Sequence, residues 1–121
     1  MDDYLGSSPN VPILVTQGKT FLLPLLYEDS SGDPVDLTDY SAEMQIRTSP
    51  LATEALVSLS SATGGIALGG TLGTIQITMT SVQTGELGIG ILSYDLFIYD
   101  SSLNATKLMY GQVKVVPSST R

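Results

Sequence analysis

The chain has 121 residues, a formal net charge of −7 at pH 7, and neither cysteine nor histidine. Its five lysine and arginine residues cannot build the cationic footprint that a nucleic-acid backbone requires, so no nucleic-acid partner is expected. The missing cysteines exclude disulfides and thiolate metal sites, and the missing histidines remove the commonest general base and metal ligand. The composition therefore predicts one domain that is not an enzyme, with no catalytic residue, no metal and no cofactor.

No membrane partner is expected either. The longest apolar runs are far too short to cross a bilayer. The acidic start, Met1-Asp2-Asp3-Tyr4, lacks the apolar segment of a secretory signal.

Residues 1–12 are expected to form an N-terminal arm ahead of a domain over residues 13–121. The arm is rich in glycine, serine and proline, and its isolated large apolar residues are Tyr4 and Leu5. One interpretation is a frayed terminus. The other is a docking arm that becomes ordered on a neighbouring subunit, because so few apolar groups cannot offset an ordering entropy of about 1–2 kcal/mol per residue. Tyr4 and Leu5 are then the predicted partner-binding residues.

Alternation of apolar and polar residues predicts strands in the first half of the domain. A short strand is expected at residues 13–16 and another at 20–27. Pro24 cannot donate to a ladder, so the second strand is predicted to lie at a sheet edge or to be bulged. The most regular alternation runs over residues 41–48.

The second half continues this pattern. Strands are predicted near residues 54–59, 66–68 and 73–80, and a single helical turn, capped by Ser81, over residues 81–87. Residues 92–116 form a predicted long β-hairpin whose turn is rich in Asp, Ser and Asn.

The total is about seven or eight short strands at turn spacings of about 8–12 residues, a pattern typical of an all-β sandwich or barrel. The inward-facing positions predict a core. Its members are Phe21, Leu23, Leu37, Tyr40, Met44, Ile46, Ile75, Ile77, Tyr94, Leu96, Val113 and Val115.

Two groups of acidic residues are candidate sites. Carboxylates that converge from a loop can hold a hard cation, but the spacing of the densest group does not match an EF-hand, and a solvated turn with Asx caps is favoured. Asp95 and Asp100 flank a strand and could pair as acid and base, although a role in solubility is favoured. The dense group consists of Glu28, Asp29, Asp33, Asp36 and Asp39.

Three further features have a structural interpretation beside a functional one. Tyr94, Phe97 and Tyr99 could stack on a sugar or a base, but they share one strand and packing in a sheet is favoured. Arg47 ends a strand and is expected to form an ion pair. A glycine-rich region lacks the lysine and helix of a phosphate loop, so it is interpreted as turns. Its glycines are Gly64, Gly65, Gly69, Gly70 and Gly73.

Several segments resemble the start of a group of small structural proteins of tailed bacteriophages, whose theme is G-x-P-x-D-L-T-G-Y-x-A-x-x-Q-I-R. They are Gln17-Gly18-Lys19-Thr20, Asp33-Pro34-Val35-Asp36-Leu37-Thr38-Asp39-Tyr40 and Ala42-Glu43-Met44-Gln45-Ile46-Arg47. Asp39 stands where the theme prefers glycine. The resemblance continues through residues 65–68, 73–75, 84–87, 94–96, 108–115 and 120–121, and the family is similar to the N-terminal domain of upper baseplate proteins.

This resemblance implies an immunoglobulin-like antiparallel β-sandwich with a short N-terminal arm. It implies a virion protein, made in the host cytoplasm, that acts in the tail, the baseplate or fibre attachment and has no catalytic residues. The implied partners are other phage structural proteins and further copies of the chain, in a homo-oligomeric or multi-copy arrangement. Two alternatives remain: a head decoration protein, and a carbohydrate-binding host-recognition module, which would need exposed aromatic residues on one face.

Overall fold

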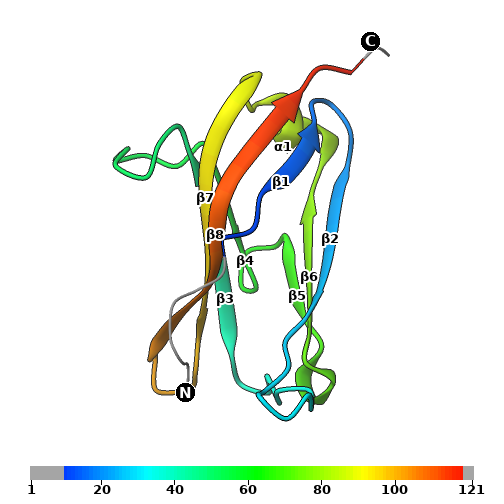
Figure 1. Cartoon of the computed structure of the whole chain (residues 1–121), viewed down its shortest axis with the longest axis vertical. Coiled ribbons are helices and arrows are strands. Elements are labelled where there is room, and N and C mark those ends of the chain that lie inside the picture. The colour runs from blue at the N-terminus through cyan, green and yellow to red at the C-terminus, as the bar shows by residue number, and fades with distance from the viewer. Residues whose placement is uncertain (1–9, 119–121) are drawn as a thin grey trace.

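The computed structural model describes residues 10–118, which form two β-sheets packed face to face (Figure 1). The five-stranded sheet has the order β1 (Ile13–Thr16), β8 (Ala105–Val116), β7 (Gly90–Tyr99), β3 (Ser41–Arg47) and β4 (Val57–Ser60). The three-stranded sheet has the order β2 (Phe21–Leu26), β6 (Thr74–Met79) and β5 (Ile66–Leu68). The predicted all-β sandwich is confirmed, with eight strands.

The strand order is that of an immunoglobulin-like sandwich. The second, fifth and sixth strands form one sheet, and the third, fourth, seventh and eighth lie together in the other. All pairs are antiparallel except one, because β1 runs parallel to β8 and joins the larger sheet. The sequence contains no cysteine and no tryptophan, so the inter-sheet disulfide and buried tryptophan of antibody domains are replaced by aliphatic packing.

β3 shows how the sequence specifies the sandwich. Its buried residues Ala42, Met44 and Ile46 alternate with half-buried polar residues, and it pairs with β7 on one side and β4 on the other. Nine of the twelve predicted core residues are buried, and Phe21, Leu23 and Tyr40 pack against the core while partly exposed.

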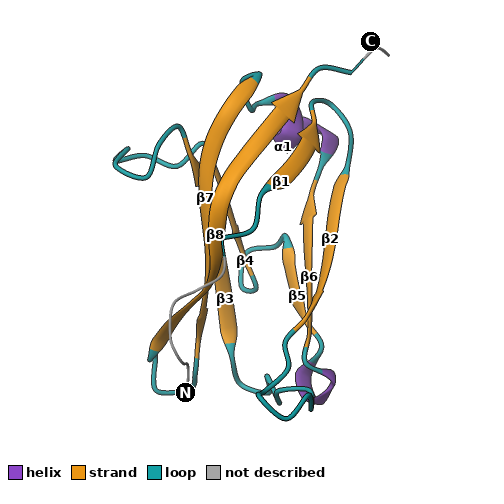
Figure 2. Ribbon diagram, in the orientation of Figure 1, coloured by secondary structure: helices purple, strands orange, loops and turns teal. Residues whose placement is uncertain are grey.

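Two short helices close opposite ends of the sandwich (Figure 2). They are the 3-10 turn at Gly70–Leu72 and α1 (Ser81–Gly85). The predicted cap of α1 was wrong by one residue: the N-cap is Thr80, whose hydroxyl accepts from the Gln83 amide while the Gln83 side chain accepts from the Thr80 amide. Within residues 10–118, no helix is long and apolar enough to cross a membrane.

β2 is the edge strand that Pro24 predicts. It pairs only with β6, and Pro24 lies exposed opposite Gln76. Because proline has no amide hydrogen, this edge is a poor template for a further strand.

Asp39 adopts the left-handed conformation, with φ 67°. Glycine reaches this conformation without steric cost. Asp39 therefore occupies a backbone position that glycine would adopt without strain.

The predicted arm overlaps the domain at its last residues. Asn10 forms a parallel bridge with Tyr110, and the Val11 amide donates to the Tyr110 carbonyl at 2.8 Å. The chain is therefore attached to β8 before β1 begins. Residues 1–9, including Tyr4 and Leu5, lie outside the described residues.

Candidate interaction surface

The outer face of the five-stranded sheet brings polar, aromatic and cationic side chains together on one surface. Strand register places Gln45 beside Asp95, and Asp95 beside Tyr110. We call this surface the outer face. Its cationic, aromatic and aliphatic residues include Arg47, Ile91, Phe97, Lys107, Tyr110 and Lys114, with Leu14 at its edge.

A β-bulge arranges the aromatic part of the outer face. Leu96 pairs with Met109 but Phe97 pairs with Lys107, so β8 has one extra residue, Leu108, at this point. The bulge turns Lys107 to the same face as Tyr110. Its ammonium lies 5.7 Å from the Phe97 ring centre and 5.4 Å from that of Tyr110, within cation–π range.

The three aromatic residues considered for stacking are divided between the two faces. Tyr94 points into the core and is buried, whereas Phe97 and Tyr99 are half-buried on the outer face with ring centres 6.3 Å apart. The Tyr99 hydroxyl donates to Glu43 at 3.3 Å, and burial, together with that carboxylate, raises the pKa of Tyr99. Tyr110, which is not one of the three candidate stacking residues, is the more exposed ring at 39%.

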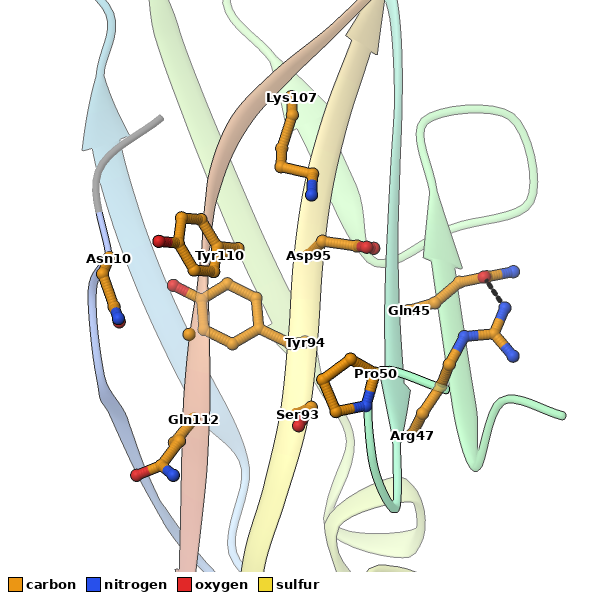
Figure 3. A pocket seen from close by; sticks show the side chains of 11 residues that line it. Asn10, Gln45, Arg47, Pro50, Ser93, Tyr94, Asp95, Lys107, Tyr110 and Gln112 are labelled. Atoms are coloured by element: carbon orange, nitrogen blue, oxygen red, sulfur yellow. Dashed lines mark hydrogen bonds between the residues drawn. The ribbon is translucent and has the colours of Figure 1, made fainter. Parts of the chain in front are cut away.

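A groove of about 290 Å³ lies in the middle of the outer face (Figure 3). Amide, carboxylate and hydroxyl groups line it, together with the Tyr110 ring. Gly111 leaves room at its base, and a Cβ there would come within 2.6 Å of the Val11 carbonyl oxygen. The polar lining residues include Asn10, Gln45, Ser93, Asp95 and Gln112.

The prediction that Arg47 forms an ion pair was wrong. Its guanidinium donates to the Ala52 carbonyl at 3.2 Å and to the Gln45 side-chain oxygen. Both acceptors are neutral, so Arg47 fixes the β3–β4 connection while its positive charge stays beside the groove (Figure 3).

The outer face also differs in charge from the rest of the chain. Its cationic residues are Arg47, Lys107 and Lys114, and its anionic residues are Glu43 and Asp95. The whole chain has five cationic and twelve anionic residues. The outer face therefore carries an excess of positive charge on an acidic protein.

The outer face also carries exposed aliphatic side chains on either side of Lys114. Lys114 pairs with Leu14 on one side and with Ile91 on the other. Leu14 is 62% exposed and Ile91 52%. Two large aliphatic groups beside a lysine stem, on the same sheet as a tyrosine, are typical of a surface that another molecule covers.

The acidic residues considered for a cation form Asx-capped turns. Asp29 accepts from the Ser31 and Asp33 amides, and Asp36 accepts from the Thr38 amide and hydroxyl, which lowers the pKa of Asp36. Within residues 10–118, no three acidic side chains converge closely enough to hold a metal ion.

The other sequence candidates are structural elements. Asp100 caps the β7–β8 turn through the Ser102 and Asn104 amides, whereas Asp95 lies on the outer face about 16 Å away along the strand, so the two carboxylates do not pair. The glycine-rich region forms turns. At Gly73, with φ 70°, an added Cβ would meet the Tyr27 carbonyl at 2.8 Å.

No protein-family model matches the chain, and no curated protein matches it. Among solved structures, it is similar to a chain from a study of the multimeric cell-adhesive interactions of VGSC beta subunits. The identity is 14% over 95% of this chain and 98% of that chain, with a TM-score of 0.47. The immunoglobulin-like assignment follows from the strand order of the two sheets.

Proposed function

We propose that this chain is a non-enzymatic structural protein of a tailed-bacteriophage virion, an adaptor of the tail, the baseplate or fibre attachment. It is made in the host cytoplasm and docks on other virion proteins and on further copies of itself. The phage-protein theme in residues 33–47 supports the assignment to a virion. The proposal that it acts by docking is carried by the outer face, where cationic, aromatic and exposed aliphatic side chains share one sheet.

Protein interfaces have this composition. Tyrosine and arginine are enriched at their centres, and well-packed apolar anchors carry most of the binding energy. Tyr110 and Ile91 are the expected anchors, since both are large and exposed on the outer face.

The proposal is tested by complementing a phage that lacks the gene with variants and measuring their amount in purified particles. Ile91→Ser and Tyr110→Ala should reduce incorporation, while the purified variants keep the thermal stability of the wild type. Leu22→Ser is the matched control, because Leu22 is similarly exposed, at 58%, on the three-stranded sheet. Incorporation of both outer-face variants at the wild-type level would show that the docking surface lies elsewhere. Absence of the wild-type chain from the particle would refute the virion assignment.

Tyr4 and Leu5 remain the predicted partner anchors of the arm. Deleting residues 1–9 should leave the melting temperature unchanged and lower incorporation into the particle. If the truncated chain is incorporated at the wild-type level, this segment is a frayed end and not a docking arm.

A carbohydrate-binding module is the second candidate, because Phe97, Tyr99 and Tyr110 share the outer face and Tyr110 lines a polar groove on it. Binding of the wild type to a glycan array, abolished by Tyr110→Ala, would favour it over docking on protein. The head-decoration alternative uses the same surface chemistry, and a map of the particle distinguishes head from tail.

A further inference from the structure

The connection between β2 and β3 is the most acidic segment of the described chain. It has five carboxylates between Tyr27 and Tyr40 and no basic residue. It lies at the lower end of the sandwich in Figure 1, away from the outer face of the β8, β7 and β3 strands.

The tip of this connection is a small, ordered hairpin. Glu28 and Pro34 form an antiparallel bridge, and the Asp29 amide donates to the Asp33 carbonyl at 2.8 Å. The Asp29 side chain accepts from two further amides inside the turn. Because the tip is already ordered, binding to a partner costs little conformational entropy in the tip itself. We call residues 28–34 the acidic tip.

The outer face carries three cationic residues against the carboxylates of Glu43 and Asp95, which leaves an excess of positive charge. Arg47 and Lys107 lie beside the groove, and Lys114 lies between two exposed aliphatic residues. Of the cationic residues within residues 10–118, only Lys19 lies outside the outer face. The remaining surface therefore offers an anionic partner few cations.

We propose that the outer face of one copy receives the acidic tip of a second copy. This deepens the proposed function, on which it rests, by naming a partner of the same surface: the charges of the two surfaces are complementary, and both are exposed on every copy. The contact joins two different surfaces, so it is heterologous and runs head to tail. A contact of this kind can be repeated from copy to copy around a ring or along a filament.

The first test is sedimentation of the purified chain at low and high salt. Self-association should weaken about tenfold or more between about 0.02 and 0.5 M salt, because the Debye length shortens several-fold over this range. A chain that stays monomeric at low salt and high protein concentration would refute the contact between copies. The particle-incorporation assay would then still decide the virion proposal.

Charge reversal gives the decisive test. Glu28→Lys with Asp33→Lys should abolish self-association, and so should Lys107→Glu with Lys114→Glu. Mixed together, the two variants should form a one-to-one complex, because one keeps a native outer face and the other a native acidic tip. Both variants keep a net negative charge, since each reversal changes the charge by four units from −7. General attraction therefore cannot explain the complex.

Control variants carry charge changes elsewhere: Glu54→Lys with Glu86→Lys matches the four-unit change of the acidic-tip variant, and Lys19→Glu makes half the change of the outer-face variant. Both controls should leave self-association intact. Equal loss in the controls, or no complex in the mixture, would overturn the proposal.

Discussion

The Tyr94 hydroxyl donates a 2.6 Å hydrogen bond to the carbonyl of Val11, a residue 83 positions earlier in the chain. Tyr94 lies on β7 and Val11 lies alongside β8, so this bond crosses a strand. It crosses at Gly111, the register partner of Tyr94, where any larger residue would collide with the Val11 carbonyl. The tyrosine and the glycine together fix the point at which the chain enters the sandwich.

Tyr94→Phe should destabilise the domain by about 1–2 kcal/mol, because it leaves the partly buried Val11 carbonyl without its donor. Urea unfolding at neutral pH measures the change. Tyr110→Phe, which removes a hydroxyl from the more exposed ring, should change the free energy of unfolding by less than about 0.5 kcal/mol. Equal effects in the two variants would show that the bond to Val11 contributes nothing specific.

The same tyrosine makes stability depend on alkaline pH. Burial raises the pKa of Tyr94 from 10.0 to about 12. The folded state therefore holds the phenolic proton more tightly than the unfolded state, and stability that is complete below pH 10 is lost as pH rises towards 12. Tyr94→Phe should lose less stability over this interval than the wild type. Parallel losses in urea titrations at each pH would contradict this assignment.

Met44→Asp should unfold the domain. Met44 is 1% exposed at the centre of β3, and the substitution would bury an unpaired charge. Gln45→Asp, one residue along on the outer face, should remain folded. Circular dichroism and thermal melting separate the two outcomes, and cooperative folding of Met44→Asp would refute the register.

Thr84→Val should cost about 1–3 kcal/mol, because a nearly isosteric apolar group replaces a buried hydroxyl that is fully used. The hydroxyl accepts from the Gly18 amide at 3.0 Å and lies 2.8 Å from the Lys19 carbonyl, to which it donates. It thus connects α1 to the β1–β2 turn. Thr78→Val, on the outside of β6, is the control and should be nearly neutral in thermal melts. A neutral Thr84→Val would show that water replaces the hydroxyl without loss.

Leu103→Asn should stabilise the domain by about 0.5–1 kcal/mol. Leu103 has φ 66° and is 76% exposed in the β7–β8 turn. A leucine in this conformation is strained, whereas asparagine tolerates it. Ser101→Asn, in the same turn at negative φ, should have little effect on the melting temperature. A drop in melting temperature for Leu103→Asn would show that the leucine makes a stabilising contact.

The strands could be predicted because their signals are local. Alternation in β3 and in the β7–β8 hairpin depends only on which side chains must be buried. Pro24 indicates a sheet edge because proline has no amide hydrogen. The parallel partner of β1 could not be predicted, since nothing in a four-residue strand specifies which neighbour it joins.

The candidate surface was harder to predict than the fold. The sequence drew attention to Phe97 and Tyr99 but not to Tyr110, because Tyr110 joins them only through strand pairing and the bulge at Leu108. Arg47 was expected to form an ion pair with a carboxylate, but its guanidinium donates instead to the Ala52 carbonyl in the β3–β4 connection. Both outcomes depend on contacts between residues, which composition and periodicity do not encode.

The parallel pairing of β1 with β8 also has a mechanical consequence. The chain enters β1 at one end of this pair and leaves β8 at the other. Tension between the two ends would slide the strands lengthwise past one another, so their hydrogen bonds would be loaded together rather than opened one after another. The bond from Tyr94 to Val11 lies just ahead of β1 and would share that load. The resistance of the domain to pulling thus depends on a strand of only four residues.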